Sequence, residues 1–172
     1  MIHNILVAYA SRTGWTVGIA EAIGKVLSGD GGQVDVLPVQ SVKDLTGYDS
    51  VVVGSAINGG AWLPAAMDFV RTFQQELRQK PFAAFLVCMT LAMKNGENYR
   101  SNVAAWLDPL RTLARPLSEG LFAGGLDISK VPSASDRLKF RLSVLLGAWK
   151  EGDHRDWQAI NSWAKELITL LN

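Results

Sequence analysis

Apolar positions along the chain recur with two different periods, and the changes between them outline strands that alternate with helices. Short apolar or β-branched runs are typical of buried strands and occur four times, and a fifth segment, 33–39, alternates between apolar and polar residues like a strand. Stretches with an apolar residue every three or four positions follow them and predict amphipathic helices. The predicted strands are 5–9, 33–39, 50–54, 82–89 and 120–126. The predicted helices run from residue 17 to the glycines at 29–32, then over 63–77, 97–114, 136–149 and 154–171, with Asp153 as the N-cap of the last one.

Strands that alternate with helices predict an α/β fold of three layers, in which helices cover both faces of a parallel sheet. The 172 residues contain no internal repeat, low-complexity tract or linker, so we expect one domain over 1–172. In such a sheet, ligands bind beyond the carboxyl ends of the strands, near the point where the strand order reverses. The loops that leave these ends are therefore the candidates for a binding site.

The turn after the first strand has the composition of an anion site. It offers three hydroxyl groups, a glycine and the unpaired N–H groups of a helix start, which together attract a phosphate. The alternative is that Ser11 and Thr13 only cap the helix. The turn lacks the G-x-G-x-x-G pattern of dinucleotide sites and the G-K-[ST] pattern of a Walker A loop. Its candidate residues are Ser11, Arg12, Thr13, Gly14, Trp15 and Thr16.

Two further loops leave neighbouring strands at the same edge. Their small residues let a flat ring approach the backbone, and the indole of Trp62 can stack on such a ring. The alternatives are that Trp62 anchors the core or a helix start, that the glycines form an ordinary turn, and that Tyr99 lies on a helix face. The candidate residues of these loops are Ser55, Ala56, Ile57, Asn58, Gly59, Gly60, Trp62, Met89, Thr90 and Leu91.

Composition excludes several classes of function. A formal net charge of +1 gives no overall field to attract nucleic acid. The one cysteine, Cys88, excludes an internal disulfide framework, and its apolar surroundings favour inert core packing. We expect no metal site and no catalytic acid or base, and neither His3 nor His154 is expected to be a ligand. The absence of a basic secretory leader and of an apolar run near 20 residues predicts a cytoplasmic protein.

The segment 128–152 lies outside the regular alternation and carries an unusual helix pattern. Leucines at 138, 142 and 145 share a helical stripe with Trp149, whereas Phe140 and Val144 point elsewhere. Four cations accompany them, namely Arg137, Lys139, Arg141 and Lys150. This pattern predicts a helix that lies on a membrane surface or a partner; packing on its own domain is the alternative. The cations also suit a flat anionic substrate such as a porphyrin with carboxylates.

The turn at 11–16 matches the flavodoxin phosphate loop, [TS]-x-T-G-x-[ST], at every constrained position. The whole chain resembles the flavodoxin-like family and, within it, the menaquinone-dependent protoporphyrinogen dehydrogenase group. Besides the turn, the resemblance rests on VVVGSAI at 51–57 and on the extra segment that closes at Asp156-Trp157. It implies bound FMN and the strand order 2-1-3-4-5. The loop 58–62 departs from the arginine- and tyrosine-containing loop of the best-known members, which bears on the substrate more than on the flavin.

Four functions are compatible with these features. The first is an FMN oxidoreductase that oxidises a porphyrinogen-like donor and reduces a quinone. The others are a flavodoxin-type electron-transfer protein with a redox protein partner, an NAD(P)H:quinone reductase, and an interaction domain with an empty flavin site. Near-neutral charge disfavours the carrier, because flavodoxin shuttles are acidic as the resemblance implies. No nicotinamide fingerprint is present, and the hydroxyl-rich turn argues against the interaction domain, so the first function is favoured.

Overall fold

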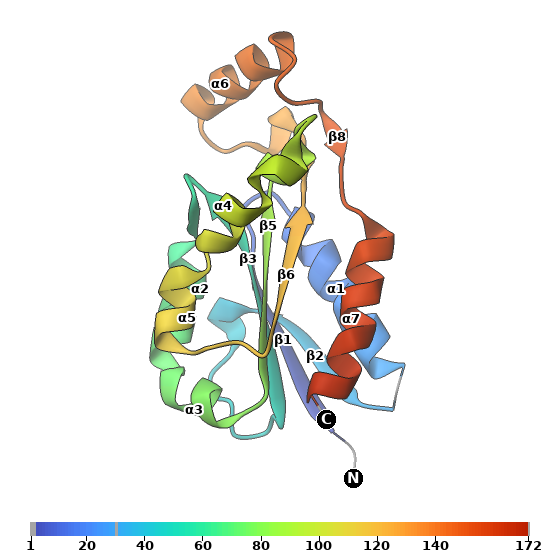
Figure 1. Cartoon of the computed structure of the whole chain (residues 1–172). Helices are drawn as coiled ribbons and strands as arrows, with labels where there is room; N and C mark the ends of the chain where they lie inside the picture. Colours follow the sequence, from blue (N-terminus) through green and yellow to red (C-terminus); the bar gives the residue numbers. More distant parts are fainter. Residues whose placement is uncertain (1–2, 30, 172) are drawn as a thin grey trace.

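A computed structural model of the chain, in which residues 3–29 and 31–171 are described, shows a central sheet between two layers of helices (Figure 1). Five parallel strands form the sheet in the order β2-β1-β3-β5-β6. They are β1 (Asn4–Ala10), β2 (Gln33–Pro38), β3 (Ser50–Asn58), β5 (Phe82–Cys88) and β6 (Ser118–Ala123). A short strand, β4 (Ala61–Trp62), pairs antiparallel with β3. Counted over the five long strands, the predicted order 2-1-3-4-5 and the α/β class are confirmed.

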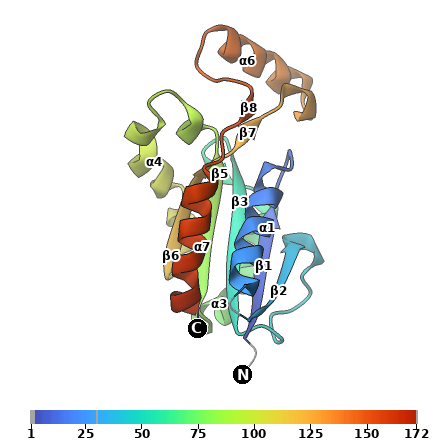
Figure 2. The ribbon, with the colours of Figure 1, turned by 90° about the vertical axis from the view of Figure 1, so that its right-hand side faces the viewer.

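The two faces of the sheet have separate apolar cores. Helices α1 (Trp15–Ser28) and α7 (Trp157–Leu171) cover one face, as Figure 2 shows. Successive residues of a strand point to opposite faces, so Ile5 and Val7 of β1 pack under these helices while Leu6 packs on the other side. Both sets are buried, which explains why the central strands β1, β3 and β5 are apolar over most of their length.

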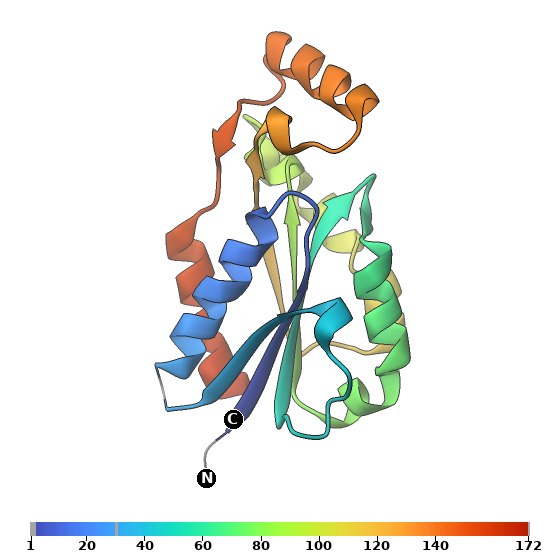
Figure 3. The same cartoon turned by 180° about the vertical axis from the view of Figure 1, so that it is seen from behind.

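The opposite face is covered by four short helices instead of the two long ones predicted. They are α2 (Pro64–Thr72), α3 (Gln74–Gln79), α4 (Arg100–Ala105) and α5 (Asp108–Leu113), and Figure 3 shows them from behind. The predicted helix 97–114 begins as a 3₁₀ turn, η3 (Gly96–Tyr99), and is interrupted before Pro109. Proline has no N–H to donate to the preceding turn, so α5 starts anew at Asp108. The predicted helix 63–77 breaks at Phe73, whose backbone is not helical and whose ring packs on Phe69.

The chain leaves the sheet earlier than the predicted strand 120–126 implies. After β6 it continues as β7 (Gly125–Leu126), which pairs antiparallel with β8 (Gly152–Asp153). Beyond this point the chain passes close to Trp15, since a Cβ atom on Gly125 would lie 2.5 Å from that ring. Asp153 belongs to this ribbon, and α7 is capped instead by Asp156, whose carboxylate accepts the N–H of Ala159 at 2.9 Å. The expected N-cap at Asp153 is therefore wrong.

Residues 127–151, between β7 and β8, form a projection that we call the arm. It contains a 3₁₀ turn, η4 (Ile128–Lys130), and helix α6 (Ala134–Leu145), shorter than the predicted 136–149. The Ser133 hydroxyl caps α6 by accepting the N–H of Asp136. Figures 1 and 2 show the arm beyond the carboxyl ends of the strands, at the end of the molecule opposite both termini. In residues 3–29 and 31–171 no helix is both long and apolar enough to cross a bilayer.

Candidate functional site

A cavity of about 350 Å³ lies between the carboxyl ends of the central strands and the arm. It is where the sequence places a site, because loops after β1, β3 and β5 converge there. Half of the predicted site residues line it. They are Arg12, Thr13, Trp15, Thr16, Ala56, Ile57, Asn58 and Met89.

The turn at 11–16 leaves the start of α1 open. Gly14 has a φ of 90°, a left-handed conformation that favours glycine, and its N–H donates to the Ser11 hydroxyl at 3.0 Å. Within the described chain, no side chain caps α1, so the capping alternative for Ser11 and Thr13 is not what the structure shows. The first N–H groups of the helix therefore remain as donors, beside the hydroxyl-bearing Thr13 and the buried Thr16. This arrangement can bind an anion.

The loop after β3 is a tight hairpin with only one part facing the cavity. Gly59 and Gly60 have φ values of 59° and 76° and connect the paired residues Asn58 and Ala61. Two consecutive positive φ angles are typical of a type I′ hairpin turn, which is why two glycines stand here. The two glycines therefore form an ordinary turn, as the alternative interpretation expected. The residues of this loop that border the cavity are Asn58 and the two before it.

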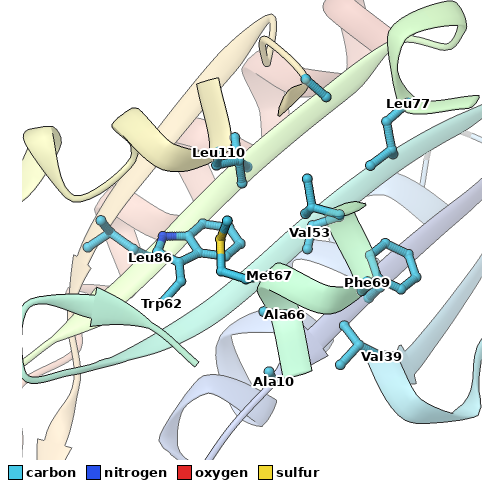
Figure 4. Packing of buried hydrophobic residues seen from close by; sticks show 14 of the residues in the cluster. Ala10, Val39, Val53, Trp62, Ala66, Met67, Phe69, Leu77, Leu86 and Leu110 are labelled. Carbon is cyan, nitrogen blue, oxygen red and sulfur yellow. The ribbon is translucent and has the colours of Figure 1, made fainter. Parts of the chain in front are cut away.

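Ser55 and Trp62 have structural roles. The buried Ser55 hydroxyl accepts the N–H of Leu63 at 3.0 Å and donates to the carbonyl of Ala56 at 2.8 Å, so both of its functions are used within the loop. Trp62 is 5% exposed and lies among Met67, Leu86 and Leu110 in the core (Figure 4). The core-anchor alternative describes Trp62, and its ring is not placed to stack on a ligand.

The loop after β5 contributes less than expected. Met89 lines the cavity, whereas Thr90 and Leu91 belong to the 3₁₀ turn η2 (Thr90–Ala92) beside it. Tyr99 is 44% exposed at the end of η3 and is outside the lining. Cys88 forms part of the cavity floor, and burial raises the pKa of its thiol, which keeps it neutral. The inert, buried cysteine expected from the sequence agrees with this position.

The arm also lines the cavity, although none of its residues is among the predicted cofactor-binding residues. Phe140 and Trp149 pack with ring centroids 5.3 Å apart and line the part of the cavity formed by the arm, which we call its roof. The predicted stripe of leucines included Trp149 because the helix was expected to continue to residue 149. Gly147, with a φ of 75°, instead ends α6, because its N–H returns to the carbonyl of Val144. Gly147, two residues before Trp149, was the available signal for this reversal.

The lining of the cavity contains two kinds of polar group, namely indole N–H donors and a carboxylate with neighbouring cations. The Trp15 and Trp149 indole N–H groups are buried and have no hydrogen-bond partner among residues 3–29 and 31–171. Asp136 lies between two cations, with its carboxylate 4.0 Å from Arg12 and 3.5 Å from Lys139. Buried donors without an acceptor are costly, so a ligand that accepts from these indoles is stabilised here.

The family model described as a flavodoxin domain matches residues 6–148, so the chain belongs to the flavodoxin-domain family. This confirms the family expected from the sequence, and FMN is the cofactor that membership implies. A curated relative, protoporphyrinogen IX dehydrogenase [quinone] from Leishmania major, is 25% identical over 173 residues, which cover 96% of this chain and 74% of that protein.

Solved structures agree with this fold. A short-chain flavodoxin associated with a PDU bacterial microcompartment superposes with a TM-score of 0.60 at 16% identity, covering 99% of this chain and all of that one (100%). A flavodoxin from the domain Archaea gives 0.54 at 19% identity, with 96% and 99% covered. At these identities the likeness shows the fold alone.

The residues of the site fit FMN. The uncapped helix start and its threonines match a phosphate, which needs several donors around one dianion. The half-buried Ala56 and Ile57 offer an apolar border for a flat ring, and the free indole N–H of Trp15 can donate to a polar group of the cofactor.

Proposed function

We propose that the chain is an FMN-dependent oxidoreductase that oxidises a flat, anionic, porphyrinogen-like donor and reduces a quinone. The observation that carries the proposal is that Phe140 and Trp149 of the arm line the same cavity, of about 350 Å³, as the phosphate-type turn. An electron carrier serves its protein partner best with an exposed flavin edge, whereas a cavity with aromatic side chains in its lining suits a small-molecule substrate.

The protein's own residues divide into two groups. Thr13, Thr16 and the first N–H groups of α1 would hold the phosphate of FMN, and 56–58 with Met89 would border its ring. When bound, FMN supplies reversible two-electron transfer, so each two-electron oxidation of the donor reduces one quinone to a quinol. The protein contributes binding, orientation and exclusion of water.

Substrate recognition falls to the arm and to Arg12. Phe140 and Trp149 offer ring faces for a flat molecule, and Arg12 and Lys139 are cations at the same cavity. Both cations lie near Asp136, and a substrate carboxylate would compete with that side chain for them. The name of the Leishmania major relative supports a porphyrinogen as donor and a quinone as acceptor.

The test is an anaerobic assay of FMN-loaded protein with protoporphyrinogen, a quinone and NAD(P)H offered in parallel. We expect porphyrinogen oxidation coupled to quinone reduction, and a loss of at least about tenfold in its kcat/KM in Phe140→Ala/Trp149→Ala, with FMN affinity nearly unchanged. Reduction of quinone by NAD(P)H alone would favour the reductase. Reduction of protein partners without porphyrinogen turnover would favour the carrier.

The cofactor site is tested separately by Thr13→Val. Removal of a hydrogen bond to a charged phosphate costs roughly 1.5–3 kcal/mol, so FMN affinity falls about tenfold or more. The matched control is Thr112→Val on α5, where the hydroxyl donates to the carbonyl of Asp108 away from the cavity. Equal FMN affinity in both variants, measured by fluorescence titration, would overturn this placement of the phosphate.

A further inference from the structure

The outer surface of the arm is apolar and faces away from the protein. Leu138, Leu142, Leu145 and Leu146 are 69%, 57%, 83% and 77% exposed. Their spacing puts the first three on one stripe of α6, and Leu146 follows directly at its C-terminal end. The apolar residues that roof the cavity, Phe140 and Trp149, lie off this stripe. The arm therefore has two apolar surfaces, of which the inner one belongs to the cavity and the outer one has no partner in residues 3–29 and 31–171.

Cations border the outer leucines. Helical geometry places Arg141 on one side of the stripe and Lys139 on the other. Segment 128–152 holds five basic residues against two acidic ones, in a chain whose formal net charge is only +1. Within the described chain, neither Arg141 nor Lys150 takes part in an ion pair. Positive charge is thus concentrated in the segment that carries the exposed leucines.

We propose that this outer surface docks the protein on an anionic lipid surface, with the leucines inserted among the headgroups. A leucine stripe flanked by cations is the composition of a helix that lies in a membrane interface. The position of the arm favours a flat partner, because it forms one end of the molecule and the rest of the protein lies behind it (Figure 2). Charge complementarity selects anionic over neutral lipid. The docking rests on the outer face alone and does not depend on which substrate the cavity binds.

The experiment uses FMN-loaded full-length protein and two kinds of vesicle, phosphatidylcholine alone and an equal mixture with phosphatidylglycerol. We expect flotation with the anionic vesicles at low salt, little flotation with the neutral ones, and release as salt is raised. Each cation near an anionic surface contributes about 1 kcal/mol, so Arg141→Gln/Lys150→Gln should weaken binding by more than about tenfold. The matched control, Lys43→Gln/Lys165→Gln, removes two exposed cations elsewhere and should bind like wild type.

The leucines are tested by Leu142→Ser/Leu145→Ser against Leu117→Ser/Leu170→Ser, which changes exposed leucines outside the arm. Only the arm variant should lose vesicle binding. A second measurement does not depend on that variant. Because the one native cysteine is buried, an environment-sensitive dye on Leu145→Cys, but not on Leu170→Cys, should report an apolar environment when anionic vesicles are added.

Three results would overturn the proposal. One is wild-type protein that ignores anionic vesicles at low salt. Another is vesicle binding that survives both arm variants. The third is a dimer in solution that becomes a monomer in Leu142→Ser/Leu145→Ser, since a second copy of the chain would then cover the leucines. Loss of vesicle binding in the arm variants with unchanged porphyrinogen oxidation would separate this docking from the function of the cavity.

Discussion

Arg155 links the phosphate-type turn to the base of the arm. Its guanidinium lies 4.9 Å from the ring centroid of Trp15 and 4.4 Å from that of Trp157, so it is held between two indoles. It donates to the Trp15 carbonyl at 3.3 Å and to both carboxylate oxygens of Asp153 in β8 at 2.8 and 2.7 Å. The position also requires Gly18, where a Cβ atom would lie 2.6 Å from the guanidinium.

We expect Arg155→Gln to lower the free energy of unfolding by about 2 kcal/mol, because stacked and bidentate contacts of a mostly buried arginine are lost together. Arg71→Gln is the control, since Arg71 and Asp68 form an exposed pair of the kind that contributes little. Urea unfolding measures both variants. Equal and small losses would show that Arg155 does not hold the turn and the ribbon together.

Part of this stabilisation depends on pH. The hydrogen bonds from Arg155 lower the pKa of Asp153 in the folded protein. The resulting contribution is therefore complete above the unfolded pKa of about 3.9 and is lost as the pH falls through the lower folded pKa. Wild type should lose more stability than Arg155→Gln over this acidic range.

For single residues, the sequence predicted which groups could bind a ligand better than it predicted which side chains are buried in the core. The turn at 11–16 was identifiable because its hydroxyls, glycine and helix start are neighbours in the chain. The roles of Ser55 and Trp62 were not, because each depends on contacts with residues brought together by folding, such as Leu63 and the core beneath α2. Trp149 lies on the cavity side of the arm and not on the leucine stripe, because Gly147 ends the helix before it.

The hairpin β3–β4 is the element whose turn type carries a clear prediction. Gly59 has a φ of 59°, and a Cβ atom at this position would have no heavy atom within 4 Å. Only the backbone conformation therefore restricts which side chain fits here. Asparagine adopts this conformation readily in type I′ turns, whereas a β-branched residue does not. We expect Gly59→Asn to be neutral and Gly59→Val to cost about 1–2 kcal/mol. Urea unfolding of the two variants checks this, and equal stabilities would contradict the assigned turn.

Elements were predictable where one period of apolar residues ran without interruption. The strands and α1 followed from that pattern within a few residues. The long helices predicted over 63–77 and 97–114 did not, because Phe73 and Pro109 divide them and apolar spacing alone gives no measure of such breaks. The departure of β7 from the sheet was not predicted either, and there Gly125 packs against Trp15, a residue distant in sequence.

The molecule as a whole separates into a layered body and the arm that overhangs its site. Neither of the two apolar clusters that flank the sheet contains a residue of the arm. The ribbon of β7 and β8 brings the two ends of the arm together, since Leu126 pairs with Gly152. Strand order followed from the resemblance to the flavodoxin-like family. Only the structure shows that the arm projects beyond the strands and that it has one apolar surface at the cavity and another that is exposed.

This separation predicts the result of replacing residues 127–151 by Asn-Gly, a two-residue turn that suits the paired ends. The shortened chain should unfold cooperatively with a free energy within about 1 kcal/mol of wild type, because both apolar clusters are retained. FMN affinity should fall by less than about tenfold, since Thr13, Thr16 and the start of α1 remain. Porphyrinogen oxidation should be lost with the roof of Phe140 and Trp149, as an anaerobic assay can measure. A chain that no longer folds would make the arm part of the core, and full porphyrinogen oxidation by the shortened chain would show that Phe140 and Trp149 do not bind the substrate.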